Sequence, residues 1–117
     1  MVVISKSVIN QYCENHADVC NALENWYRTV GDADWSNLKD MKDTFNSVDY
    51  VGSDRYVFNI KGNRFRLIAL VFFSVRTVYI KFIGTHAEYD KINALTVNLK
   101  RIWKSQTTKN SEMPLKP

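Results

Sequence analysis

The chain has 117 residues, of which 45% are hydrophobic and 24% are charged, and its formal net charge is +4. A chain of this length and apolar content is expected to fold as one globular domain rather than to stay disordered. It has no stretch near the ~18 consecutive apolar residues of a membrane span, and its first residues do not resemble a secretory signal, so we expect a cytoplasmic protein. The positive charge permits a polyanionic partner but does not require one.

The first half of the chain predicts a short strand followed by helices. Apolar spacing changes from that of a strand to that of a helix after the first few residues. Asp18 is expected to cap the second helix and Gly31 to end it, and Ser36 or Asn37 is expected to cap the third. The brief connection between the first two helices favours an antiparallel pair. The expected elements cover residues 2–5, 6–16, 18–31 and 36–45.

In the second half the apolar period becomes two, which predicts three strands of an antiparallel meander. These strands cover residues 56–61, 64–73 and 77–84. Gly62 and Asn63 mark the first hairpin turn, and residues 74–76 mark the second. Apolar residues recur at helical spacing from Ile92 to Trp103, so a last helix is expected there.

Together these elements predict a single α+β domain over residues 1–104. We expect a twisted, mainly antiparallel sheet with helices packed on one face and a further helix at the C-terminal end. Residues 105–117 are polar and contain two prolines, so they are expected to form a disordered tail.

The chain has two cysteines, Cys13 and Cys20. Placed seven residues apart on one helix, they would share a face two turns apart, which is too distant for a disulfide. A metal site would need further ligands at close spacing, and His16 is the only neighbour of a suitable type. We therefore interpret both as inert or structural thiols, with redox sensing as a remaining alternative.

Positive charge gathers at the first hairpin of the meander. Strand alternation predicts that Arg64 and Arg66 share one face. Arg66 lies within a strand that is otherwise nearly all apolar, where a guanidinium needs an anionic partner or a functional reason to be present. The alternative for Lys61 and Arg64 is that cations near a turn protect strand edges against aggregation. The candidate phosphate-binding residues are Asn59, Lys61, Asn63, Arg64 and Lys81.

A second group of polar residues follows the last strand of the meander. His86 is a candidate for proton transfer because histidine titrates near neutrality, although a lone histidine is more often structural. Tyr89 is a candidate for stacking on a nucleobase or for acting as a base. Asp90 is expected to cap the final helix, and Glu88 either orients His86 or caps.

Common enzyme motifs are absent from the sequence. There is no glycine-rich phosphate loop, no HExxH, no CxxC and no GxSxG motif. A nuclease built on these residues is therefore expected to use cations in place of a metal ion, and no cofactor is expected.

Residues 57–67 and 79–90, with Trp26-Tyr27-Arg28 and Ala33-Asp34-Trp35, resemble the HigB-type toxins of bacterial type II toxin–antitoxin modules. The resemblance runs from about residue 1 to residue 92. It implies a RelE-like fold and a metal-independent endoribonuclease that cleaves mRNA on the translating 70S ribosome. It also implies a helix-turn-helix antitoxin of the HigA type as partner, with operator DNA bound only through the toxin–antitoxin complex.

By position in the motif, the resemblance implies catalytic roles for three residues. Arg66 corresponds to the arginine that stabilises the phosphorane, while His86 and Tyr89 fall where such enzymes place proton-transfer and base-stacking residues. Lys61 and Arg64 would assist in binding phosphate. Two other classes stay open: a non-catalytic module that binds RNA or the ribosome, and an inactive toxin homologue that only binds its antitoxin.

Overall fold

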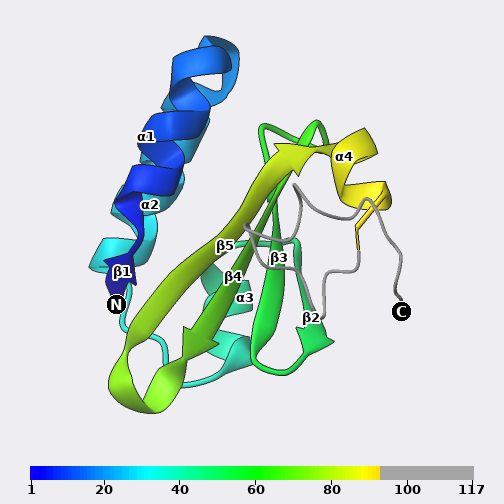
Figure 1. Cartoon of the computed structure of the whole chain (residues 1–117). Coiled ribbons are helices and arrows are strands. Elements are labelled where there is room, and N and C mark those ends of the chain that lie inside the picture. Colours follow the sequence, from blue (N-terminus) through cyan, green and yellow to red (C-terminus); the bar gives the residue numbers. More distant parts are fainter. Residues whose placement is uncertain (93–117) are drawn as a thin grey trace.

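The computed structural model describes residues 1–92, which form a five-stranded sheet with helices (Figure 1). The strands are β1 (Val2–Ile4), β2 (Val48–Gly52), β3 (Arg55–Ile60), β4 (Phe65–Phe72) and β5 (Thr77–Thr85). The α-helices are α1 (Lys6–Asn15), α2 (Cys20–Asp32), α3 (Leu38–Thr44) and α4 (His86–Asp90). Short 3-10 helices, η1 and η2, cover Ala17–Val19 and Phe73–Val75.

The order of strands in the sheet is β1-β5-β4-β3-β2. Strands β2 to β5 form an antiparallel meander, and β1 pairs in parallel with β5, with Val3 opposite Val78. The α+β class, the mainly antiparallel sheet and the three predicted meander strands are therefore confirmed. A register shift between Ile68 and Ala69 against β5 marks a bulge, which leaves Lys81 outside the regular pairing.

Helices α1, α2 and α3 cover one face of the sheet, as the sequence predicts. Trp26 of α2 packs edge-on against Phe58 of β3 with ring centres 5.3 Å apart. Leu67 of β4 and Leu23 of α2 are fully buried in the same cluster, and each such side chain contributes roughly 1.5–3 kcal/mol of burial free energy. This apolar layer packs the helices on one face of the sheet and leaves the opposite face free of α1 to α3.

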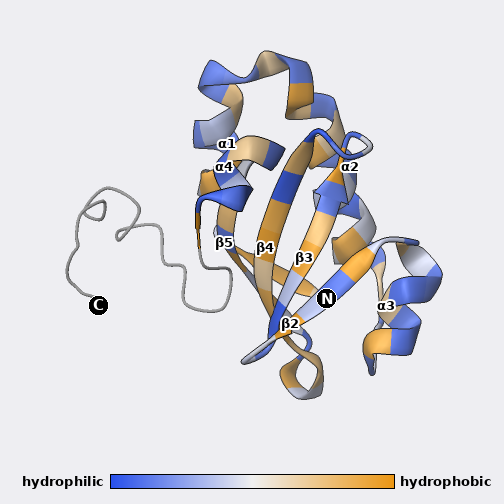
Figure 2. Cartoon of the chain, turned by 90° about the vertical axis from the view of Figure 1, so that its right-hand side faces the viewer, coloured by the Kyte–Doolittle hydropathy of each residue, from blue (hydrophilic) through white to orange (hydrophobic). Residues whose placement is uncertain are grey.

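The opposite face of the sheet carries a smaller apolar cluster. Val57, Ile68 and Phe82 are buried there, and Tyr89 and Ile92 pack against them. Two views agree that α4 lies on the other side of the sheet from α1 and α2 (Figures 1 and 2). We call this second surface the open face, because α1 to α3 leave it uncovered.

Helix boundaries follow local capping. The Asn37 side chain accepts a hydrogen bond from the Asp40 amide at 2.9 Å and so caps α3. Of the two expected caps, Ser36 and Asn37, the structure therefore has Asn37. Asp18 lies in the 3-10 helix before α2, so its expected role as the cap is wrong. Helix α2 continues to Asp32, one residue beyond the expected stop at Gly31.

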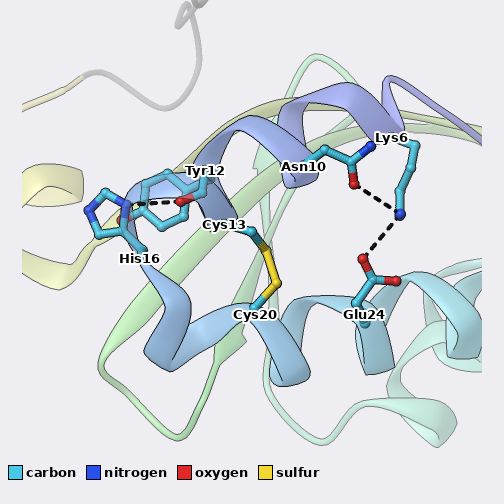
Figure 3. The surroundings of a disulfide bond; sticks show 7 residues. All are labelled: Lys6, Asn10, Tyr12, Cys13, His16, Cys20 and Glu24. Carbon is cyan, nitrogen blue, oxygen red and sulfur yellow. Dashed lines mark hydrogen bonds and ion pairs between the residues drawn. A yellow bond between two sulfur atoms is a disulfide. The ribbon is translucent and has the colours of Figure 1, made fainter.

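A disulfide bond joins Cys13 and Cys20, whose Cα atoms are 5.2 Å apart. The expectation that these cysteines are too far apart is wrong, because they do not share a helix. Helix α1 ends at Asn15, the 3-10 turn reverses the chain, and Cys20 opens α2. The bond spans the two antiparallel helices beside this turn (Figure 3).

The helix expected between Ile92 and Trp103 and the tail expected at 105–117 lie outside the described residues, apart from Ile92 itself. Helix α4 ends at Asp90, and Ile92 donates its amide to the carbonyl of Tyr89 at 3.2 Å. Within residues 1–92, every helix is too short or too polar to cross a membrane.

Candidate functional site

Arg66 is the centre of the candidate site. It lies on the open face, between Asn59 of β3 and Gly84 of β5 in one row across the sheet. Its Nη1 donates to the carbonyls of Asn63 at 3.0 Å and Phe65 at 3.3 Å. Both bonds use the same nitrogen, so the rest of the guanidinium can donate to an anion on the open face.

Gly84 brings helix α4 close to Arg66. A Cβ atom built on Gly84 would lie 2.5 Å from Cζ of Phe82 and 2.9 Å from Oε1 of Glu88. No larger residue fits this position without moving the Phe82 ring or the start of α4. No role was predicted for Gly84 from the sequence, although glycine inside a strand is a recognised sign of close approach.

A capping box fixes the direction of α4 at the end of β5. The Thr85 hydroxyl accepts from the Glu88 amide at 3.1 Å, and the Glu88 carboxylate accepts from the Thr85 amide at 2.8 Å. The His86 amide also donates to the carbonyl of Arg64 at 3.0 Å, which ties α4 to the β3–β4 hairpin. The cap of α4 is therefore Thr85 with Glu88. The helix that Asp90 was expected to cap lies outside the described residues.

Asp90 instead contacts His86. Its Oδ2 lies 3.0 Å from Nδ1 of the imidazole, one helical turn away. This contact favours the tautomer with the proton on Nδ1 and leaves Nε2 to accept a proton from a ligand. The His86 side chain is 52% exposed, so a large substrate such as a nucleic acid can reach it.

Tyr89 lies over Arg66. The centre of its ring is 6.0 Å from the guanidinium carbon, within the range of a cation–π contact. The ring is half-buried against the open-face cluster. Arg66 and Tyr89 therefore form one surface, with His86 at the start of the same helix.

Lys61 and Arg64 do not join this surface. The Lys61 Nζ donates to the carbonyl of Asp18 at 2.7 Å, and Nη2 of Arg64 lies 3.9 Å from the Asp18 carboxylate. Lys61 has a φ of 53°, so it leaves the alternation of the strand before it. The expectation that Arg64 and Arg66 share a face is wrong, because the Arg64 side chain points toward the turn between α1 and α2.

The other three predicted phosphate-binding residues, Asn59, Asn63 and Lys81, lie at different distances from Arg66. The Asn59 amide lies beside Arg66 and donates to the hydroxyl of Ser47. Asn63 contributes its backbone carbonyl to Arg66. Lys81 lies three residues before Gly84 on β5, about 10 Å along the strand, so it is separate from the Arg66 row.

Tyr12 of α1 lies behind this end of the sheet. Its ring stacks on His16 with centres 3.9 Å apart, and its edge meets Phe65 at 6.3 Å. Burial raises the pKa of Tyr12 to about 12, and the negative charges of Glu88 and Asp18 add to this effect. Tyr12 is therefore a protonated structural residue at neutral pH rather than a base.

No group of three or more metal-ligating side chains converges within residues 1–92. The polar groups around Arg66 are a guanidinium, an imidazole with its carboxylate partner, a phenol and an amide. A set of this kind has the chemistry to bind an anionic group such as a phosphodiester and to move a proton beside it.

Residues 19–92 match the family model HigB_toxin, which describes the RelE-like toxic component of a toxin–antitoxin system. The α+β fold with its mainly antiparallel sheet agrees with this class. The chain belongs to the HigB toxin family. It is 31% identical over 94 residues to mRNA interferase HigB of Escherichia coli O6:H1, across 79% of this chain and 91% of that protein. It is 30% identical over 98 residues to mRNA interferase toxin HigB of Escherichia coli K12, across 81% of this chain and 93% of that protein.

Proposed function

We propose that this protein is the toxin of a type II toxin–antitoxin module and acts as an endoribonuclease on mRNA at the translating ribosome. Its curated relatives are named mRNA interferases. The observation that carries the proposal is the surface on which Tyr89 lies 6.0 Å over Arg66 and the imidazole of His86 is held by Asp90. These residues supply what RNA cleavage requires: a cation for the phosphate, a group that moves a proton and a ring for a base.

In the proposed reaction the ribose 2′-hydroxyl attacks the adjacent phosphorus. The P–O5′ bond breaks, and the products are a 2′,3′-cyclic phosphate and a 5′-hydroxyl end. Arg66 stabilises the charge that develops on the phosphorane, and a preplaced donor of this kind is typically worth about 3–4 kcal/mol. No metal or cofactor enters this proposal, because the guanidinium takes the role of the cation.

His86 and Tyr89 share the remaining tasks in this proposal. With Nδ1 held by Asp90 at 3.0 Å, Nε2 of His86 takes the proton from the 2′-hydroxyl or gives one to the leaving 5′-oxygen, and water supplies the other proton transfer. Tyr89 stacks on the base next to the scissile bond. Asn59 adds a hydrogen bond beside Arg66, while Lys61, Arg64, Asn63 and Lys81 bind the flanking phosphates from the hairpin and β5.

The proposed partners follow from the family. Toxins of this kind require an antitoxin, and we propose a helix-turn-helix protein of the HigA type that also brings the complex to its operator DNA. We propose the cytoplasm as the location, because the substrate is mRNA on the ribosome.

The chemistry of the cleaved ends tests this proposal. Purified protein is added to a translation reaction, the RNA is isolated, and its new ends are tested for 2′,3′-cyclic phosphate and 5′-hydroxyl groups. The same ends should form after Arg66→Lys at a reduced rate, and they should be lost after Arg66→Ala. Ends that carry 5′-phosphate would contradict the mechanism. Binding of ribosomes without any cleavage would favour the non-catalytic alternative.

A further inference from the structure

The Cys13–Cys20 disulfide lies beside the residues that hold the basic hairpin. It joins the end of α1 to the start of α2 and closes the turn that contains Asp18. Both cysteines are half-buried, so small solutes can reach them. Figure 3 shows the bond between the two helices, with Tyr12 and His16 on one side of it and the Lys6–Glu24 ion pair on the other.

We propose that Cys13–Cys20 is a thiol–disulfide exchange site for small monothiols of the glutathione class, and that its redox state sets how firmly Asp18 holds Lys61 and Arg64. The second part rests on the function proposed above. In the cytoplasm, proposed above as the location, a structural disulfide is unusual, and such bonds are mostly transient or redox-sensing. A half-buried bond beside phosphate-binding cations is consistent with a redox-sensing disulfide.

The exchange reaction can begin at either sulfur. Cys20 follows the 3-10 helix directly, and its amide donates to the Ala17 carbonyl, so the start of α2 gives neither thiolate a clear advantage. Written for attack on Cys13, a monothiolate attacks Sγ of Cys13, forms a mixed disulfide and releases the Cys20 thiolate, which takes up a proton.

A second monothiolate completes the reduction by attacking the external sulfur of the mixed disulfide. This step forms the small-molecule disulfide and releases the Cys13 thiolate, which is then protonated. Two electrons and two protons pass from two small thiols to the protein, and reoxidation by the small disulfide reverses each step.

The turn closed by the disulfide holds both cations of the hairpin. The Asp18 carbonyl accepts from Lys61 at 2.7 Å, and its carboxylate lies 3.9 Å from Arg64. While the disulfide fixes both ends of the turn, these groups compete with phosphate for the two cations. Reduction removes the covalent link across the turn, so the exposed Asp18, next to the buried Val19, holds Lys61 and Arg64 less firmly and they become more available to RNA.

Reduction is not expected to unfold the protein. Val19 and Leu23 on one side of the bond, and Ile9 on the other, are fully buried against the sheet. These contacts keep α1 and α2 in place, so the change is confined to the turn around Asp18. A local change of this kind can alter RNA binding while the fold persists.

Thiol counting tests the exchange site without reference to RNA. The full-length protein is equilibrated with defined ratios of reduced to oxidised glutathione, quenched in acid, alkylated and weighed by mass spectrometry. The expected result is a reversible change of two thiols per chain while the circular dichroism spectrum is kept. A bond that persists in millimolar reduced glutathione, or one that is lost only with unfolding, would overturn the exchange site.

RNA binding tests the coupling. The probe is a single-stranded RNA with 2′-O-methyl groups, which cannot be cleaved by attack of the 2′-oxygen. The reduced protein should bind it about 3- to 10-fold more tightly than the oxidised protein. The slope of log binding constant against log salt concentration should be steeper by about 1.4 for the reduced protein. Two more phosphates are neutralised, and each contributes about 0.7 to this slope in a single strand.

Asp18→Asn supplies a matched variant for the same assay. In the oxidised protein it should raise RNA affinity toward that of the reduced wild type, while Asp32→Asn removes an equal charge away from the hairpin and should have a smaller effect. Equal affinities of the oxidised and reduced forms would overturn the coupling. A protein that exchanges its thiols but binds no RNA in either form would overturn the proposed function and leave the exchange site standing.

Discussion

Asp90 and His86 face each other across one turn of α4, with Oδ2 and Nδ1 3.0 Å apart. Helix α4 has only five residues, and its capping box is made by Thr85 and Glu88. Asp90 therefore has no part in the cap of α4, and its carboxylate contacts the imidazole. This pair engages Nδ1, so Nε2 is the ring nitrogen that remains for a ligand.

Asp90→Asn should slow RNA cleavage about 10-fold with little change in KM, because an amide orients the imidazole less firmly than the carboxylate does. His86→Ala should cost more, within the ~10²–10⁴-fold range of general acid–base catalysis. Single-turnover cleavage across a pH series measures both, with Asp43→Asn on α3 as the control. Wild-type rates and an unchanged pH profile for Asp90→Asn would show that the pair has no part in the reaction.

Gly84→Ala should lower the free energy of unfolding by about 1–3 kcal/mol, because the new methyl group meets Phe82 and Glu88. The matched control is Gly31→Ala, where no atom lies within 4 Å of the new Cβ. That variant lies in helix α2 and should gain up to about 1 kcal/mol. Urea denaturation measures both, and an unaltered midpoint for Gly84→Ala would contradict the close approach of α4.

Periodicity predicted the meander and the helical layer because these depend on local spacing. Burial alternates only toward the ends of β3 and β4, because Val57 and Ile68 at their centres are buried in the second apolar cluster on the open face. Asn37 is a recognisable cap. The parallel pairing of β1 with β5 joins segments about 75 residues apart in the chain. No local pattern carries that information.

Turns account for most of the errors at the site. The alternating pattern predicted that Lys61 and Arg64 are strand residues. In the structure Lys61 adopts a left-handed conformation and Arg64 lies before β4 begins. The distance between Cys13 and Cys20 was likewise misjudged because the chain reverses between them. The predicted positions of Arg66, inside a strand, and of His86, directly after one, agree with the structure because both depend on regular elements.

Stability should fall as the pH rises from about 10 to about 12, through the titration of Tyr12. Its pKa is raised from 10.0 to about 12, so the folded protein holds the proton more tightly than the unfolded chain. The stability that the protonated Tyr12 adds to the folded state is complete below about pH 10 and is lost toward pH 12. Tyr12→Phe should therefore lose less stability over this range.

Urea denaturation at about pH 9 and about pH 11.5 measures the effect of Tyr12. Tyr79→Phe, which changes an exposed tyrosine, is the control and should keep the wild-type dependence. Burial also raises the pKa of Tyr56, so part of the alkaline loss should persist in Tyr12→Phe. Identical slopes for the wild type and Tyr12→Phe would contradict the assignment to Tyr12.

Reduction of Cys13–Cys20 should lower the free energy of unfolding by about 2–3 kcal/mol, the value expected for a closed loop of this size. The double variant Cys13→Ser, Cys20→Ser should match the reduced wild type and should not respond to reductant. Denaturant melts of the oxidised and reduced protein measure the difference. Equal stabilities would show that the bond contributes nothing to the folded state.

Primer extension on an mRNA under translation, with and without the protein, tests the central claim most directly. It should reveal discrete new 5′ ends with the wild type, and Arg66→Ala should reduce them at least ~10²-fold while its thermal melt is unchanged. Lys81→Ala, away from the Arg66 row, should reduce them far less, and a reaction without ribosomes should give none. New ends that persist in folded Arg66→Ala would contradict the site, and their absence with the folded wild type would contradict the proposed activity.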